Sequence, residues 1–179
     1  MKIQPLNIDS KKKYILVYTI CFIVMAFAAS LPWIVTGTSF VWKIDGQGQH
    51  YPALVYLGQT LREFFVGVFS GHPKWNMWDL NIGFGSDVVG TLNYYCIGDP
   101  LDLLSVFVPK AYTEYLYEFL IIFRMYLAGL AFSAFAFYKK AKYYPTLIGA
   151  FVYPFSGYVL MYGIKHPFFT NPLIYLPLL

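Results

Sequence analysis

The chain has 179 residues, of which 58% are hydrophobic and only 12% are charged. Soluble domains carry about 25% charged residues, so this composition leaves too little polar surface for a soluble globular protein. The formal net charge of +4 comes from lysine clusters beside apolar stretches, which indicates membrane topology and argues against a nucleic-acid-binding patch.

The first apolar stretch covers residues 14–35 and contains no charged residue. At about 1.5 Å per residue, a helix of this length crosses a hydrocarbon core of about 30 Å. The stretch therefore predicts a transmembrane helix. A cleaved signal peptide is the alternative, but its apolar region is only about 7 to 15 residues long.

Residues 36–115 are of mixed polarity and rich in Gly, Pro, Asn and Asp. Segments of this length between spans usually carry function or structure of their own. Apolar side chains recur at helical spacing over residues 53–69, opposite Gln59, Arg62 and Glu63. This pattern predicts an amphipathic helix lying on the membrane surface.

Three further apolar stretches follow, at 116–138, 146–164 and 172–179, and the first of them, the second predicted span, contains Arg124. Charges inside a membrane are costly and usually functional. Arg124 could bind the phosphate of a lipid carrier, or it could pair with an acid on a helix absent from this chain. The last apolar stretch is too short to cross a membrane, so we expect the chain to be a fragment.

Lysine clusters precede the first span and follow the second, which predicts a cytoplasmic N-terminus and an external long loop in the plasma membrane. The sequence thus predicts an all-α, multi-pass integral membrane protein. Its segments are a cytoplasmic N-terminus (1–13), transmembrane helix 1 (14–35), an external loop with interfacial helices (36–115), transmembrane helix 2 (116–138), a cytoplasmic loop (139–145), transmembrane helix 3 (146–164), an external loop (165–171) and the start of transmembrane helix 4 (172–179).

Asp45 follows the first predicted span by about ten residues, at the outer interface. A carboxylate screened there by glycine and aromatic residues could act as a general base on a lipid-linked or a soluble substrate. A turn aspartate before Gly46 is the alternative, and spacing alone favours it. Asp99 is the second acidic candidate, although its Gly-Asp-Pro context also fits capping of a helical turn.

Several spaced motifs resemble the first-loop signatures of the bacterial YfhO family. Their order along the chain makes the resemblance specific, and it covers essentially the whole chain. The residues that carry it are Asp45 to Pro52, Trp75 to Trp78, Ile82 to Asp87, Tyr94 to Leu104, His166-Pro167, Asn171-Pro172 and Leu176-Pro177.

The resemblance implies an inverting GT-C-type glycosyltransferase. Such an enzyme moves a sugar from a polyprenyl-phosphate carrier to an external cell-surface polymer such as a teichoic acid, and Asp45 matches the acid at its active centre. Gln49, His50 and Asp99, which lie in these motifs, are candidates for substrate binding, and Arg124 is one from its place in the second span. His166 could also contact donor or acceptor, whereas packing at the interface is the favoured role of His50. No residue spacing defines a metal site, although a divalent ion could bridge Asp45 and Asp99 to a phosphate.

A non-catalytic transporter, flippase or scaffold subunit for lipid-linked sugars is the alternative function. Transporters place decisive polar residues near the bilayer midplane, often on broken helices. Here the polar residues gather in the external loop, which favours surface chemistry. Gly149, Pro154 and Gly157 in the third predicted span favour the transporter.

Overall fold

A computed structural model describes residues 8–179, so residues 1–7 of the predicted N-terminal segment lie outside it. The chain forms two compact units, which we describe separately. The helical unit comprises the chain up to Thr38 together with Ile122–Leu160 and Thr170–Leu179. The loop unit comprises Ser39–Ile121 and Met161–Phe169.

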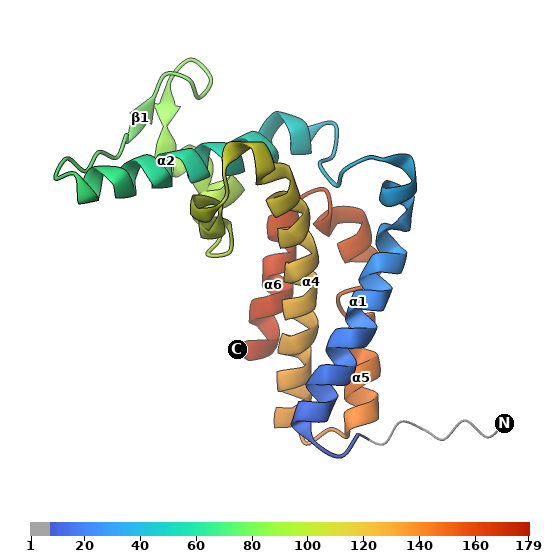
Figure 1. Ribbon diagram of the computed structural model, residues 1–179. Helices are drawn as coiled ribbons and strands as arrows, with labels where there is room; N and C mark the ends of the chain where they lie inside the picture. Colours follow the sequence, from blue (N-terminus) through green and yellow to red (C-terminus); the bar gives the residue numbers. More distant parts are fainter. Residues whose placement is uncertain (1–7) are drawn as a thin grey trace. The chain divides into compact units, whose positions relative to one another are not determined.

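Two long apolar helices supply most of the helical unit (Figure 1). Helix α1 covers Lys11–Thr36, and α4 covers Thr113–Tyr138, of which the part from Ile122 belongs to this unit. Ser10 caps α1 by accepting a hydrogen bond from the Lys13 N–H, and Gly37 ends it in the left-handed conformation with φ of 61°. Both helices are long and apolar enough to cross a membrane. The first two predicted spans therefore coincide with continuous helices.

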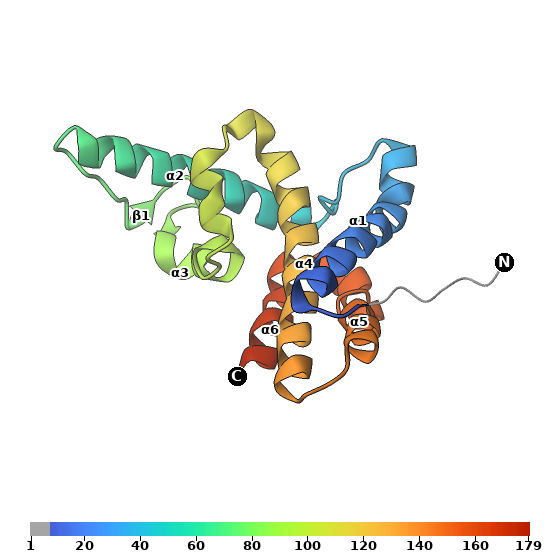
Figure 2. The same cartoon turned by 60° about the horizontal axis from the view of Figure 1, so that its bottom comes forward.

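Helices α1, α4 and α5 (Tyr143–Val152) lie side by side, as both cartoon views show (Figures 1 and 2). The Tyr18 hydroxyl donates to the Tyr126 carbonyl at 2.9 Å, and the Tyr18 ring stacks on Phe151 with centroids 5.3 Å apart. Gly129 permits this approach, because a Cβ there would overlap the Tyr18 hydroxyl. Small residues allow the same close contact between membrane helices generally.

The range predicted for the third span, 146–164, is not one helix. Helix α5 ends at Val152, a turn follows, and a π-helix resumes over Val159–Gly163. Pro154 accounts for the break, since proline lacks the N–H that a helix needs and its ring clashes with the preceding turn. The final residues form the short helix α6 (Asn171–Tyr175) and a 3₁₀ turn (Leu176–Leu178).

The loop unit is built around one helix of ordinary length, α2. Two strands pair in antiparallel register, Trp78 with Asp87 and Asp79 with Ser86. The first part of α4 also belongs here, and the Glu118 carboxylate accepts a hydrogen bond from the Phe40 N–H at 3.1 Å. The elements before α4 are η1 (Gly46–His50, a π-helix), α2 (Tyr51–Phe69), β1 (Trp78–Asp79), β2 (Ser86–Asp87), α3 (Val88–Leu92), η2 (Asn93–Ile97, a π-helix), η3 (Asp102–Phe107) and η4 (Lys110–Tyr112), the last two being 3₁₀ helices.

Helix α2 matches the predicted amphipathic helix in extent but not in what its apolar stripe contacts. Leu54 and Leu57 are only 3% and 2% exposed, and Leu57 packs in a core with Val88 and Leu92. The prediction that this part of the stripe faces the membrane is therefore wrong, because the loop supplies its own partner surface. Further along the helix the stripe is open, since Phe65 and Val68 are 46% and 45% exposed and the final residue, Phe69, is 89% exposed.

Candidate functional site

Asp45 stands immediately before the π-helix η1, at the start of the loop unit. A Cβ on Gly46 would lie 3.2 Å from the Trp42 Cβ, so glycine suits this tightly packed position. The Gln49 Nε2 group donates to the Asp45 Oδ1 atom at 3.2 Å. Isolated π-helical turns are frequent at functional sites. The GQGQ sequence thus brings an amide against one oxygen of the carboxylate.

The other carboxylate oxygen faces a histidine from a distant part of the sequence. The His166 Nε2 atom lies 3.8 Å from the Asp45 Oδ2 atom, with side-chain exposures of 20% and 30% respectively. On the opposite edge of the same ring, His166 Nδ1 lies 2.9 Å from His50 Nε2. Both contacts are satisfied when His166 carries its proton on Nε2 and His50 donates from its own Nε2.

His50 is the buried end of this series, with an exposed fraction of 3%. Burial, with a smaller contribution from His166, lowers the pKa of His50 to about 4, against an opposing effect of Asp45. His50 is therefore neutral near pH 7, and a neutral imidazole both donates and accepts a hydrogen bond. The side chains of Asp45, His166 and His50 form a continuous series of polar contacts. The series begins at the half-exposed Asp45 and ends at the buried His50.

Aromatic rings hold this series in place. The Trp42 ring meets His166 edge-on at 5.8 Å, and Tyr95 meets His50 edge-on at 5.3 Å. The Tyr95 hydroxyl also donates to the Gln49 Oε1 atom at 3.0 Å, which fixes the amide that contacts Asp45. We call Asp45, Gln49, His50, Tyr95 and His166 the Asp45 cluster.

A hollow of about 330 Å³ lies beside the Asp45 cluster within the loop unit. Gln49 and Tyr95 of the cluster line it together with Tyr56 and Asn81. Its volume falls at the lower end of the range for small-molecule sites, about 300 to 1,000 Å³. These polar groups share the wall with the apolar side chains of Pro52, Ile82 and Leu92, so the hollow is of mixed polarity.

The structure brings together three of the five predicted site residues, Asp45, Gln49 and His50. Asp99 belongs to the same loop unit and is 3% exposed, and its carboxylate accepts a hydrogen bond from the Leu101 N–H at 2.9 Å. This contact is an Asx turn that precedes η3, whose N-cap residue Leu101 makes no side-chain capping bond, so the structure shows a turn role for Asp99 and not the predicted capping. Arg124 belongs to the helical unit, on α4, and is 2% exposed.

Tyr95 is the cluster member that the sequence analysis did not name, and His166 was named only as a possible contact of donor or acceptor, not as a partner of Asp45 and His50. His166 is 116 residues from its partner His50, so no local spacing joins them. The His-Pro pair at 166–167, one of the motifs noted in the sequence, was the available signal. Among residues 8–179, no group of three His, Cys, Asp or Glu side chains is arranged to hold a metal ion.

These features define the class of the protein. Two membrane-length apolar helices, a structured polar loop and a composition short of charge describe a helical membrane protein. The family model for the bacterial membrane protein YfhO matches residues 16–179, and the chain belongs to this family. This confirms the family that the loop motifs predict. No curated protein and no solved structure matches the chain.

Proposed function

We propose that this protein acts in glycosyl transfer at the membrane surface, moving a sugar from a polyprenyl-phosphate carrier to an extracytoplasmic polymer such as a teichoic acid. The main support is the Asp45 carboxylate, whose two oxygens face the Gln49 amide and the His166 imidazole. Membership in a membrane protein family and the adjoining hollow are consistent with a lipid-linked, polyhydroxylated substrate.

In the proposed reaction, Asp45 takes the proton from an acceptor hydroxyl. The hydroxyl oxygen attacks the anomeric carbon, and the bond from that carbon to the carrier phosphate breaks. The electron pair leaves with the phosphate, so one displacement transfers the sugar with inversion. Gln49 and His166 hold the carboxylate in one orientation, which is how a positioned base gains its advantage.

This function requires the loop unit to face outward, as the lysine clusters predict. We therefore expect a cysteine at Lys74 to react with an impermeant thiol reagent in intact cells, and one at Lys140 to be protected. The natural cysteines, Cys21 and Cys96, are first replaced by alanine to remove the background. Labelling with the opposite sidedness would place the Asp45 cluster in the cytoplasm and overturn the proposal.

Asp45→Asn in the full-length protein tests the proposed base. The change keeps the volume and the contact with Gln49 but removes the proton acceptor. General-base assistance is worth about 10² to 10⁴ in rate, so we expect a loss in that range in sugar incorporation at equal protein level. Retention of more than about a tenth of wild-type activity would exclude Asp45 as the base.

Asp87→Asn is the matched control, because the structure gives Asp87 a local structural role that asparagine can also fill. The Asp87 carboxylate caps α3 by accepting a hydrogen bond from the Gly90 N–H. Asparagine caps a helix nearly as well, so this variant should keep its activity. An equal loss in both variants would show that these loop substitutions act by disturbing the fold, and Asp45 would lose its assignment.

A transporter or flippase of lipid-linked sugars is the second candidate. The broken helix at Pro154 favours it, since transporters bind substrate at such interruptions. The two functions differ in which variant abolishes the cellular product. A transporter predicts that Pro154→Ala eliminates sugar translocation while Asp45→Asn is tolerated, and an enzyme predicts the reverse.

A further inference from the structure

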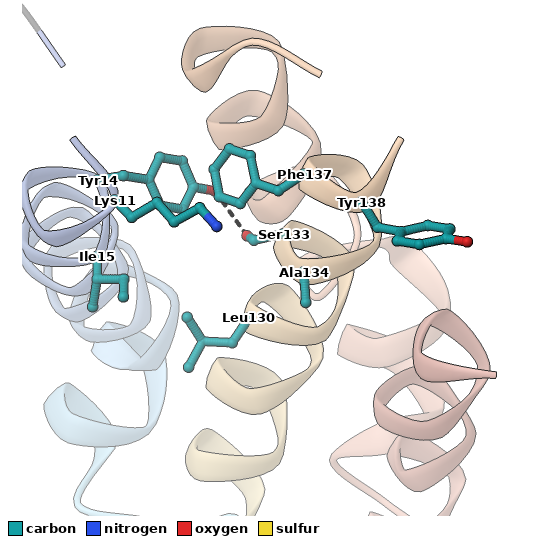
Figure 3. A pocket seen from close by; sticks show the side chains of 8 residues that line it. All are labelled: Lys11, Tyr14, Ile15, Leu130, Ser133, Ala134, Phe137 and Tyr138. Carbon is teal, nitrogen blue, oxygen red and sulfur yellow. Dashed lines mark hydrogen bonds between the residues drawn. The ribbon is translucent and has the colours of Figure 1, made fainter. Parts of the chain in front are cut away.

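A second hollow, of about 450 Å³, lies in the helical unit between the first turns of α1 and the last turns of α4 (Figure 3). Its walls are mainly apolar, with Ile15 on one helix and Leu130, Ala134 and Phe137 on the other. Polar groups are confined to one side, where the Tyr14 hydroxyl and the Ser133 hydroxyl form a hydrogen bond of 2.7 Å. The hollow is therefore amphipathic.

Lys11 supplies the charge of this hollow. It is the first residue of α1, and in Figure 3 its side chain extends toward α4 and the Tyr14–Ser133 pair. Tyr138, the last residue of α4, also lines the hollow, but its ring points away from α1 and is 80% exposed. An ammonium group and two hydroxyls thus lie at the mouth of an apolar groove.

The N-terminal end of α1 is positively charged, which favours the binding of an anion. The N-terminal end of a helix carries a partial positive charge, so cations in the first turn are unfavourable there. Lys11, Lys12 and Lys13 nevertheless occupy that turn, which holds no acidic residue. Lys13 pairs with Asp9 at 3.8 Å, and the described part of the chain provides no such ion pair for Lys11. The partial positive charge of the helix terminus and the ammonium charge of Lys11 therefore lie together beside the groove.

We propose that this groove binds one anionic phospholipid of the bilayer. The phosphate contacts the Lys11 ammonium at the helix terminus, and one acyl chain lies along Ile15, Leu130 and Ala134. The site lies at the ends of two membrane-length helices, where headgroup and hydrocarbon meet. Charge complementarity favours a phosphatidylglycerol-type lipid over a zwitterionic one. This inference does not depend on the proposed sugar transfer.

Native mass spectrometry of the full-length protein with phosphatidylglycerol and phosphatidylcholine tests the proposal. Wild-type protein should retain one tightly bound phosphatidylglycerol in preference to phosphatidylcholine. Lys11→Gln should weaken its retention about fivefold, the size expected for one lysine at an anionic surface. Lys12→Gln removes the same charge from the same turn but does not line the groove, so it should change retention less than twofold. Equal effects of the two substitutions would overturn the site.

A second variant tests the groove rather than the charge. Ala134 is exposed on the groove wall, so Ala134→Phe fills the space without entering the helical core. This variant should remain monodisperse and lose the bound lipid. Retention of the lipid would overturn the proposal.

A photoreactive amino acid at position 134 identifies the occupant directly. Crosslinking to a lipid of phosphatidylglycerol mass supports the proposal. Crosslinking to protein, either another segment of the full-length chain or a second copy, would show that a helix fills the groove and would overturn it. The same holds for crosslinking to phosphatidylcholine alone.

Discussion

Two acidic regions of the loop unit use their carboxylates differently. In the region of Asp87 and Asp99, each carboxylate accepts a hydrogen bond from a backbone N–H two or three residues further along the chain. At the start of the unit, Asp45 instead faces the side chains of Gln49 and His166. The first arrangement shapes a turn, and the second holds a carboxylate in place without using it as a cap.

This difference matters because most side-chain hydrogen bonds in proteins go to backbone or water. A carboxylate that satisfies a local backbone donor has an evident structural role. A half-exposed carboxylate set between an amide and an imidazole has the surroundings expected of a positioned base. The contrast therefore separates Asp45 from Asp87 more clearly than their spacing in the sequence does.

After the loss expected for Asp45→Asn, the next largest effect should come from His166. His166→Gln removes the imidazole beside the Asp45 Oδ2 atom and acts on the chemistry only through that carboxylate. We expect sugar transfer to fall about 10- to 100-fold, less than the full assistance of a base. His72→Gln replaces an exposed histidine of the same unit and should leave transfer unchanged. Full retention of transfer in His166→Gln would reduce His166 to a packing role.

Arg62 tests the structural side of the comparison, because its Nη1 group donates to the carbonyls of Ser105 and Val108, each at 2.7 Å. Arg62→Met should lower the free energy of unfolding by about 2 kcal/mol, the scale of hydrogen bonds from a charged donor. Thermal unfolding in detergent measures the effect, with Lys110→Met removing an exposed charge as control. Sugar transfer per folded molecule should be kept; its loss would connect this region to the chemistry.

Substitutions of Asp87 should have the smallest effect of those considered. They also distinguish Asp87 from Asp45 most sharply, because they should change stability and not activity. Asp87→Ala removes the cap of α3 and should cost about 1 kcal/mol of stability, whereas Asp87→Asn should cost only a few tenths. Unfolding midpoints of the two variants, measured alongside Asp45→Asn, give the comparison. For Asp45 we expect the reverse pattern, a large change in activity with little change in stability. A stability loss at Asp45 as large as that of Asp87→Ala would erase the distinction between the two regions.

The two long helices were predictable from sequence, because the local pattern of apolar residues determines them. Residues 14–35 form an uninterrupted apolar stretch, and residues 116–138 form one that contains only two charged residues, Glu118 and Arg124. The two stretches lie within α1 and α4. The third range failed at Pro154, where the chemistry of one residue outweighed average hydropathy. Leu57 shows a different limit, because periodicity reveals an apolar face without revealing whether lipid or protein covers it.

Within the candidate site, the local part was predictable and the distant part was not. Asp45, Gln49 and His50 share one motif, and one turn of π-helix brings the first two into contact. His166 reaches them only because residues 161–169 pack with the loop unit rather than with their neighbours in the chain. Contacts of this kind depend on tertiary packing, which a single sequence does not encode at any fixed spacing.

The separation of His166 from His50 has a consequence for synthesis. At about 5 to 20 residues per second, the ribosome needs roughly 6 to 23 s to make the 116 residues that separate them. During that interval the nascent loop carries Asp45 and His50 without their shared partner. The Asp45 cluster can therefore be completed only after the segment following α5 has emerged, which couples maturation of the site to the insertion of later helices. For the same reason, a peptide cut to residues 39–121 would lack the His166 edge of the cluster, whereas joining residues 161–169 to it would restore the missing side chain.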